Sequence, residues 1–227
     1  MFPTSSSDLL SRVMLVIILM LSLCVHEWAH AWSAWRLGDD TAARMGRLTL
    51  NPFAHADLLG TIVLPLLLVP FGWAKPVPIN PARFRRSVRM STGVMITAAA
   101  GPLANIILAV LCAIAFGLAY RLAPESVMPG SPLRMLLAGG VLGEHYVPGL
   151  LQLNVTLAIF NLIPVPPLDG SRILDGLMPL RLRPSWEAFA RFSPFLLLGV
   201  VFLGGRLIAG PAGYVLGLLQ ALINTIA

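Results

Sequence analysis

Charged residues are scarce in this chain of 227 residues: Asp, Glu, Lys and Arg together make up 11% of it, against about a quarter of an ordinary globular protein. Hydrophobic residues make up 57%, and the mean hydropathy is +0.81. This balance lies outside the range of ordinary soluble domains. It predicts a protein that crosses a membrane several times.

Cysteine is nearly absent as well. The two cysteines, Cys24 and Cys112, both lie within apolar runs, where a cysteine is most simply a small packing residue. We therefore expect no disulfide framework.

Histidine occurs four times, and two of the four stand in the sequence HEWAH at residues 26–30. This is an H-E-x-x-H motif. On a helix His26 and His30 project from one face, where both imidazoles can bind one Zn²⁺ ion, and Glu27 is placed to take a proton from an attacking water. The motif predicts a metalloprotease site.

The surroundings of the motif strengthen this prediction. Residues 13–25 are uncharged and apolar, and ionisable groups at membrane depth cost a few kcal/mol each, about 3 on insertion scales, unless something compensates them. A bound metal ion compensates two histidines. The alternative is a pair of core histidines with Glu27 at the membrane interface.

Four apolar segments are candidates for crossing the bilayer: residues 9–35, 92–120, 147–163 and 194–226. The last is either one tilted span or two shorter pieces. A further segment, residues 58–72, is short and contains Pro65 and Pro70, which favours a re-entrant element. We expect an all-α polytopic membrane protein with about four to six membrane helices and a short re-entrant or membrane-associated β-loop.

Alternating prolines mark residues 75–81, KPVPINP. Proline excludes a helix here and confines a strand to the edge of a sheet, where it can accept another strand. The segment Pro76, Val77, Pro78 and Ile79 is therefore a candidate for pairing with a substrate. The alternative is a stiff solvent loop.

Basic residues indicate the orientation. If residues 58–72 are re-entrant, the loops 36–57, 73–91 and 170–193 share one side and hold twelve of the sixteen Lys and Arg residues. The positive-inside rule makes that side cytoplasmic. The ends of the first and third spans then meet at one face, which brings His26, His30 and Asp169 within reach of one metal ion.

A catalytic zinc ion needs a third protein ligand. Asp169 is favoured, because it lies on the correct face at a helix end broken by prolines, although an Asp-Gly pair is also a common turn. The other candidates lie in the nearby loop or on the opposite face: Asp39, Asp40, His55, Glu144 and His145.

Five blocks in this order resemble the site-2 protease family of intramembrane zinc metalloproteases, its small prokaryotic members in particular. They are HEWAH (26–30), GRLTLNPFAHADLLGT (46–61), GWAKPVPINP (72–81), AGPLAN (100–105) and NLIPVPPLDG (161–170). The resemblance covers about residues 9–176. It implies His26, His30 and Asp169 as zinc ligands, Glu27 as general base, Asn161 as a substrate or oxyanion contact, and KPVPINP as a membrane-associated β-loop that pairs with substrate.

We therefore expect an intramembrane zinc metalloprotease that cleaves peptide bonds in or near transmembrane segments. Its one domain would span residues 1–227, with a core at about 9–176 and a final membrane segment at about 194–226. The expected partners are the bilayer and a transmembrane protein substrate, without nucleic acid, and the oligomeric state is left open. Two alternatives are a metal-binding membrane transporter and a catalytically silent membrane scaffold. The presence of Glu27 favours an enzyme, because zinc binding alone does not require this residue.

Overall fold

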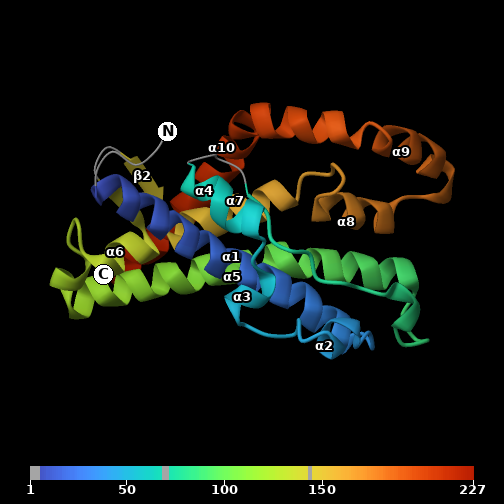
Figure 1. Ribbon diagram of the computed structural model, residues 1–227, viewed down its shortest axis with the longest axis horizontal. Coiled ribbons are helices and arrows are strands. Elements are labelled where there is room, and N and C mark those ends of the chain that lie inside the picture. Colours follow the sequence, from blue (N-terminus) through green and yellow to red (C-terminus); the bar gives the residue numbers. More distant parts are fainter. Residues whose placement is uncertain (1–5, 68–71, 143–144) are drawn as a thin grey trace.

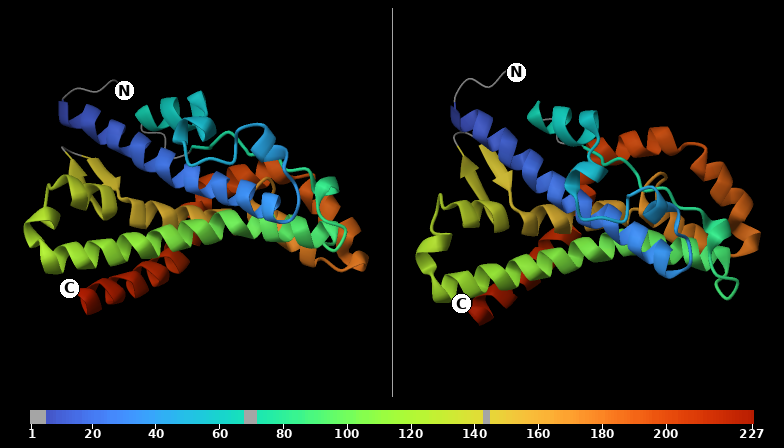
Figure 2. Two further views of the ribbon diagram at one scale, coloured as in Figure 1. Left: turned by 90° about the horizontal axis from the view of Figure 1, so that it is seen from below. Right: turned by 60° about the horizontal axis from the view of Figure 1, so that its bottom comes forward.

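The computed structural model describes residues 6–67, 72–142 and 145–227. Three helices are long and apolar enough to cross a membrane: α1 (Ser6–Arg36), α5 (Met90–Leu122) and α10 (Ser193–Ile226). Helices α1 and α5 contact each other near the carboxyl end of α1 and diverge toward its amino end (Figure 1 and Figure 2), and α10 also contacts α5. The chain is a mostly helical membrane protein, as the composition predicts.

Helix α5 is the centre of the bundle, in contact with α1, α7 (Leu150–Asn161), α8 (Asp169–Leu177) and α10. Small residues on α5 make these close approaches possible, because they let helix backbones come together in a membrane. Ala109 and Ala113 are fully buried, and a Cβ atom on Gly117 would lie 3.0 Å from Ile226 of α10. The buried core therefore follows α5.

The third span predicted at residues 147–163 is wrong in its length. The helix α7 has only 12 residues, Leu150–Asn161, fewer than the roughly 20 that cross a bilayer perpendicularly. The chain before α7 forms an antiparallel hairpin of β1 (Gly139–Leu142) and β2 (His145–Pro148), with Gly139 opposite Pro148. The hairpin uses the residues that would have extended the helix.

Most of this hairpin lies between the second and third predicted spans, in residues 121–146. The same stretch also contains η3 (Pro124–Val127) and α6 (Pro132–Leu137). The final apolar stretch is one continuous helix of 34 residues, α10, with Pro211 inside it. Before it come η4 (Leu180–Leu182) and α9 (Arg183–Ala190).

The connection between α1 and α5 makes an excursion and returns. It contains the short helices α2 (Thr41–Arg44), α3 (Pro52–His55), η1 (Leu58–Val63), α4 (Leu64–Leu66) and η2 (Pro81–Arg83). The Lys75 amide donates a hydrogen bond of 2.9 Å to the His55 carbonyl, which closes the base of the excursion. The two flanking loops therefore meet, as a re-entrant element requires. Pro70 lies outside the described residues.

Residues 75–80 contain no helix or strand, and Pro81 begins η2. The prolines exclude a helix as expected, but the expected edge strand does not form among the described residues. Instead of a neighbouring strand, the segment uses side chains and turns of the α1 region. Val77 bonds to Glu27, and Asn80 bonds to Asp39.

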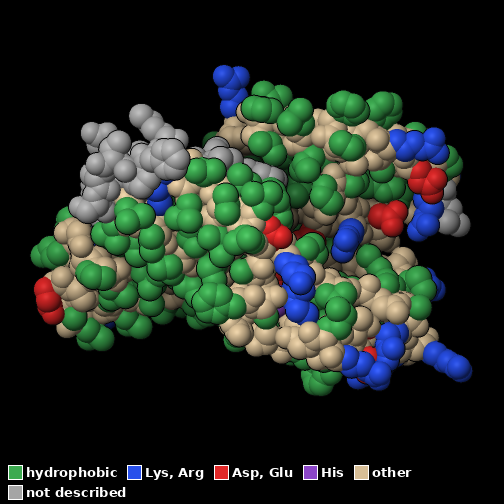
Figure 3. Space-filling view, viewed as in Figure 1, with side chains coloured by type: hydrophobic (Ala, Val, Ile, Leu, Met, Phe, Trp, Pro, Cys, Tyr) green, Lys and Arg blue, Asp and Glu red, His purple; other side chains and the backbone are tan. Residues whose placement is uncertain are grey.

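Charge is distributed unevenly along the molecule. Lys and Arg side chains gather at the end that carries α2 and α9, whereas the opposite half of this face is largely hydrophobic (Figure 3). Figure 2 shows that the hairpin and the carboxyl end of α10 lie at the other end of the bundle, away from α9. This separation is the pattern expected when one end meets anionic headgroups and cytosol.

The contact between the loops 36–57 and 73–91 predicts that they lie on one side of the membrane. Met45→Cys (Met45 is 63% exposed) and Ser87→Cys should both be labelled, or both be protected, when intact cells are treated with an impermeant thiol reagent. Met128→Cys, beyond the other end of α5, should show the opposite result. Cys24 and Cys112 are buried and add little background. Different labelling of Met45→Cys and Ser87→Cys would show that residues 58–72 cross the membrane.

Candidate metal centre

Three ligand atoms converge where α1 meets the start of α8. The Nε2 atoms of His26 and His30 lie 3.0 Å apart. The Oδ2 atom of Asp169 lies 3.1 Å from the first and 3.3 Å from the second. Among the described residues, this is the one group of three or more His, Cys, Asp and Glu side chains placed to hold a metal ion.

These distances fit a zinc ion. Nitrogen and oxygen ligands at about 2.0–2.1 Å in tetrahedral geometry lie about 3.3 Å from one another. The Asp169 Oδ2 atom is buried and has no hydrogen-bond partner, a costly state for a carboxylate unless a cation pairs with it. Two imidazoles and one carboxylate are a common protein donor set for catalytic zinc.

Asp169 reaches the site because the chain turns sharply after α7. Prolines between residues 164 and 167 prevent α7 from continuing, and α8 begins at Asp169 and packs against α5. Val165 and Leu168 of this turn are buried against Val200 of α10. The carboxylate is therefore held between packed elements and not on a free loop.

Both histidines are oriented from behind by helix α5. His30 Nδ1 lies 2.6 Å from the Thr97 carbonyl oxygen, which can only accept, so this nitrogen carries the proton and Nε2 is left as a lone-pair donor. His26 Nδ1 lies 2.6 Å from Asn105 Oδ1. The same tautomer follows at His26, because the Asn105 amide nitrogen is already engaged elsewhere.

That engagement is a chain of buried polar side chains. Asn105 Nδ2 donates to Asn154 Oδ1 at 2.6 Å, and Asn154 Nδ2 donates to Ser22 Oγ at 2.9 Å. All three residues are fully buried, and they stand on α5, α7 and α1 respectively. In the sequence, Asn105 is an amide within an apolar span, where polar residues are rare and typically bond across helices; the part played by Asn154 and Ser22 was not predicted.

Gly101 lets α5 pass directly over the two rings. A Cβ atom at this position would lie 2.5 Å from His30 Nε2 and 2.7 Å from His26 Cε1, closer than any real contact. A side chain at position 101 would therefore collide with the metal ligands, so the site itself requires a glycine here.

The ligand group opens into a cavity of about 280 Å³. Of the residues predicted to act on substrate, Glu27, Pro76, Val77, Ile79 and Asn161 line it. Glu27 Oε2 accepts a hydrogen bond of 2.8 Å from the Val77 amide, and Asn161 Nδ2 donates to the Leu157 carbonyl at 3.0 Å. Pro78, although predicted with them, is not among the lining residues.

Arg172 also lines this cavity, and sequence analysis did not mark it. It follows Asp169 by three residues, so on helix α8 it lies on the same face one turn later. That spacing was the available signal.

The other candidates for the third ligand have different partners. Asp39 accepts from the Asn80 amide at 2.6 Å, and His55 Nε2 bonds to the Thr49 carbonyl at 2.8 Å. Asp40 pairs with Arg44 at 2.6 Å and Arg83 at 2.7 Å; the hydrogen bond from Arg44 lowers the pKa of this carboxyl. Glu144 and the side chain of His145 lie outside the described part of the chain.

An H-E-x-x-H helix and a distant aspartate that converge inside a bundle of apolar helices define an intramembrane zinc metalloprotease. Residues 14–203 match peptidase family M50, and the chain belongs to this family, the site-2 proteases.

Two curated relatives support this membership. "Putative zinc metalloprotease YwhC" of Bacillus subtilis (strain 168) is 42% identical over 192 residues, which cover 84% of this chain and 81% of the relative. "Putative zinc metalloprotease Rip2" of Mycobacterium tuberculosis (strain ATCC 25618 / H37Rv) is 32% identical over 197 residues, 84% of this chain and 65% of the relative. No solved structure matches the chain.

The hydrogen bonds behind the rings predict a measurable effect on metal affinity. Asn105→Leu removes the acceptor for His26 Nδ1, and we expect zinc affinity of the purified protein to fall about 10–100-fold, the usual cost of losing such a partner. Ser22→Ala, at the far end of the same chain, should cost less. Competition with a chromogenic chelator measures both, and unchanged affinity in Asn105→Leu would show that the amide does not orient His26.

Proposed function

We propose that His26, His30 and Asp169 hold one catalytic zinc ion and that Glu27 is the general base for hydrolysis of a peptide bond in a transmembrane substrate. The observation that carries this proposal is the convergence of three ligand atoms within 3.3 Å of one another, with Glu27 lining the same cavity. When bound, zinc supplies a Lewis acid that polarises the scissile carbonyl and acidifies water.

Glu27 moves the proton in this mechanism. Its carboxylate takes a proton from the water whose oxygen bonds to the carbonyl carbon, and then delivers that proton to the amide nitrogen as the carbon–nitrogen bond breaks. Glu27 follows His26 in the helix, so it faces the cavity beside the ligands and not among them. Its role is proton transfer.

Asn161 is placed to hold the substrate. One N–H of its amide bonds to the Leu157 carbonyl, which leaves the second N–H for a substrate carbonyl or for the negative charge that develops on that oxygen. Because Asn161 is the last residue of α7, its position depends on where that short helix ends.

The extended segment at residues 75–79 is the proposed substrate platform. A transmembrane helix has its carbonyls in internal hydrogen bonds and must be extended before attack. Pro76, Val77 and Ile79 line the cavity, so an extended substrate lying along them comes next to Glu27. Prolines 76 and 78 carry no N–H, and the Val77 amide is therefore the one donor between Lys75 and Ile79.

We also propose that the active site opens to the cytoplasm and that residues 1–227 act as one protease unit, with its core at about 9–176 and a final membrane segment at about 194–226. The orientation rests on the loops 36–57, 73–91 and 170–193, which hold twelve of the sixteen Lys and Arg residues.

Two substitutions separate metal binding from chemistry. Glu27→Gln keeps the side-chain shape but removes the proton acceptor, so we expect full zinc content and a loss of cleavage of about 10²-fold or more. Asp169→Ala removes one of three ligands and should lose zinc and activity together. The test measures the zinc content of each purified variant and, in parallel, its cleavage of a single-span reporter in liposomes. A fully loaded Asp169→Ala protein would contradict the ligand assignment.

A backbone substitution tests the platform. Val77→Pro removes the N–H that bonds to Glu27, while Pro78 already confines residue 77 to extended conformations that proline tolerates. We expect cleavage of the reporter to fall about tenfold or more with zinc content unchanged.

Val77→Ala keeps the N–H and serves as the matched control. Equal cleavage by Val77→Pro and Val77→Ala would show that the bond between Val77 and Glu27 has no part in catalysis.

A further inference from the structure

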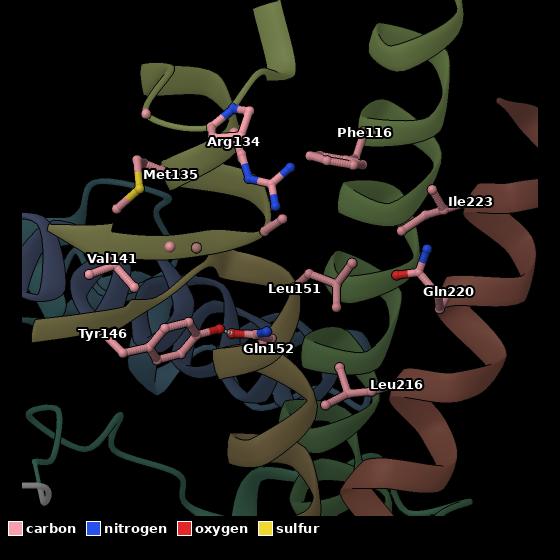
Figure 4. A pocket seen from close by; sticks show the side chains of 15 residues that line it. Phe116, Arg134, Met135, Val141, Tyr146, Leu151, Gln152, Leu216, Gln220 and Ile223 are labelled. Atoms are coloured by element: carbon pink, nitrogen blue, oxygen red, sulfur yellow. Dashed lines mark hydrogen bonds between the residues drawn. The ribbon is translucent and has the colours of Figure 1, made fainter. Parts of the chain in front are cut away.

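A second, larger cavity lies at the end of the bundle away from the metal centre. Its volume is about 680 Å³, within the range of sites for small organic ligands. Five elements surround it: α5, α6, the hairpin, α7 and α10 (Figure 4). None of the 15 residues that line it lines the metal cavity.

The charge of this cavity is of one sign. Arg134 of α6 points its guanidinium group into the space (Figure 4), and none of the described residues that line it is an Asp or Glu. Among the described residues, the one hydrogen bond that this guanidinium group makes is a long one, 3.4 Å from Nη1 to the Val127 carbonyl. Most of its donors therefore remain for a ligand, and a guanidinium group favours phosphate and carboxylate.

Neutral polar groups lie across the cavity from Arg134. The Tyr146 hydroxyl donates to the Gln152 side-chain oxygen, which orients the Gln152 amide nitrogen as a further donor. Gln220 of α10 faces the same space (Figure 4), and its amide nitrogen donates to Asn224 at 2.9 Å. The donors that face the cavity are therefore the guanidinium group of Arg134 and the amide nitrogen of Gln152.

The remaining wall is apolar and belongs to membrane helices. Phe116 comes from α5, and Leu216 and Ile223 come from α10; both helices are candidate spans. A free phosphate ion would satisfy Arg134 but leave this wall uncovered. The ligand that matches both parts carries an anionic group and a hydrocarbon tail.

We propose that this cavity binds one anionic phospholipid, with its phosphate on Arg134 and an acyl chain along Phe116, Leu216 and Ile223. A free phosphate ion and a phospholipid would make the same contacts with Arg134. The apolar wall favours the phospholipid, because only the lipid has an acyl chain to cover it. A guanidinium group binds phosphate through charge-assisted hydrogen bonds, and the apolar wall covers an acyl chain. The lipid would join α10 to the hairpin and to α5 at the end opposite the catalytic site.

The test uses the full chain in nanodiscs of phosphatidylcholine that contain a minority of phosphatidylglycerol. Native mass spectrometry should find one retained phosphatidylglycerol per wild-type chain. Arg134→Gln should reduce its occupancy about tenfold or more, since hydrogen bonds to charged groups are among the stronger ones. Arg121→Gln is the matched control, because Arg121 is exposed at the same end of α5 and does not line the cavity.

Two further arms separate the lipid from other anions and from misfolding. Leu216→Trp narrows the apolar part without a change of charge and should also release the lipid, whereas millimolar inorganic phosphate should not displace it. Thermal unfolding of each variant in detergent checks the fold. The proposal would be overturned if Arg121→Gln and Arg134→Gln lost phosphatidylglycerol equally, or if inorganic phosphate displaced the bound lipid.

Discussion

The hydrogen bonds from the two imidazole Nδ1 atoms to helix α5 are the interaction on which the centre of this protein depends. A buried ring nitrogen without a hydrogen-bond partner costs free energy, and the two Nδ1 atoms face the interior of the bundle. Thr97 and Asn105 supply the partners on one side, so the Nε2 atoms can only face Asp169. The tautomer, the ring orientation and the direction of the metal site follow from this one constraint.

The same constraint reaches beyond α5. Asn105 must itself be satisfied, which brings in Asn154 of α7, and Asn154 in turn bonds to Ser22 of α1. These side-chain bonds join three helices, and backbone carbonyls of the same helices accept further hydrogen bonds from Asn105 and Asn154. A polar core of this kind specifies which helix faces meet, whereas apolar packing between membrane helices is less selective.

Much of this could be predicted from the sequence, because the motif chemistry is local. His26, Glu27 and His30 lie within about one helical turn. The prolines after residue 163 indicate where α7 must end. The third ligand required an argument about topology, which the charge distribution supplied. The length of α7 and the hairpin at residues 139–148 could not be predicted, since strand pairing depends on contacts that composition does not record.

The role of Asn105 and Asn154 was also beyond reach, because a polar residue in a span indicates some partner but not which one. At residues 75–80 the prolines exclude a helix, and tertiary contacts determine the neighbours of the segment. Glu27 and Asp39, side chains of the α1 region, occupy the positions that a second strand would have taken.

The close passage of α5 over the imidazoles also fixes the position of that helix along and about its own axis. Every neighbour of Gly101 from Ala98 to Pro102 carries a Cβ atom, and a Cβ atom facing the rings at the position of Gly101 would lie 2.5 Å from His30. A shift of α5 by one residue, or a rotation about its axis, would therefore drive a side chain into the histidines. The two histidines thus fix the axial position and the rotation of the central helix, and with them the alignment of the spans that pack on it.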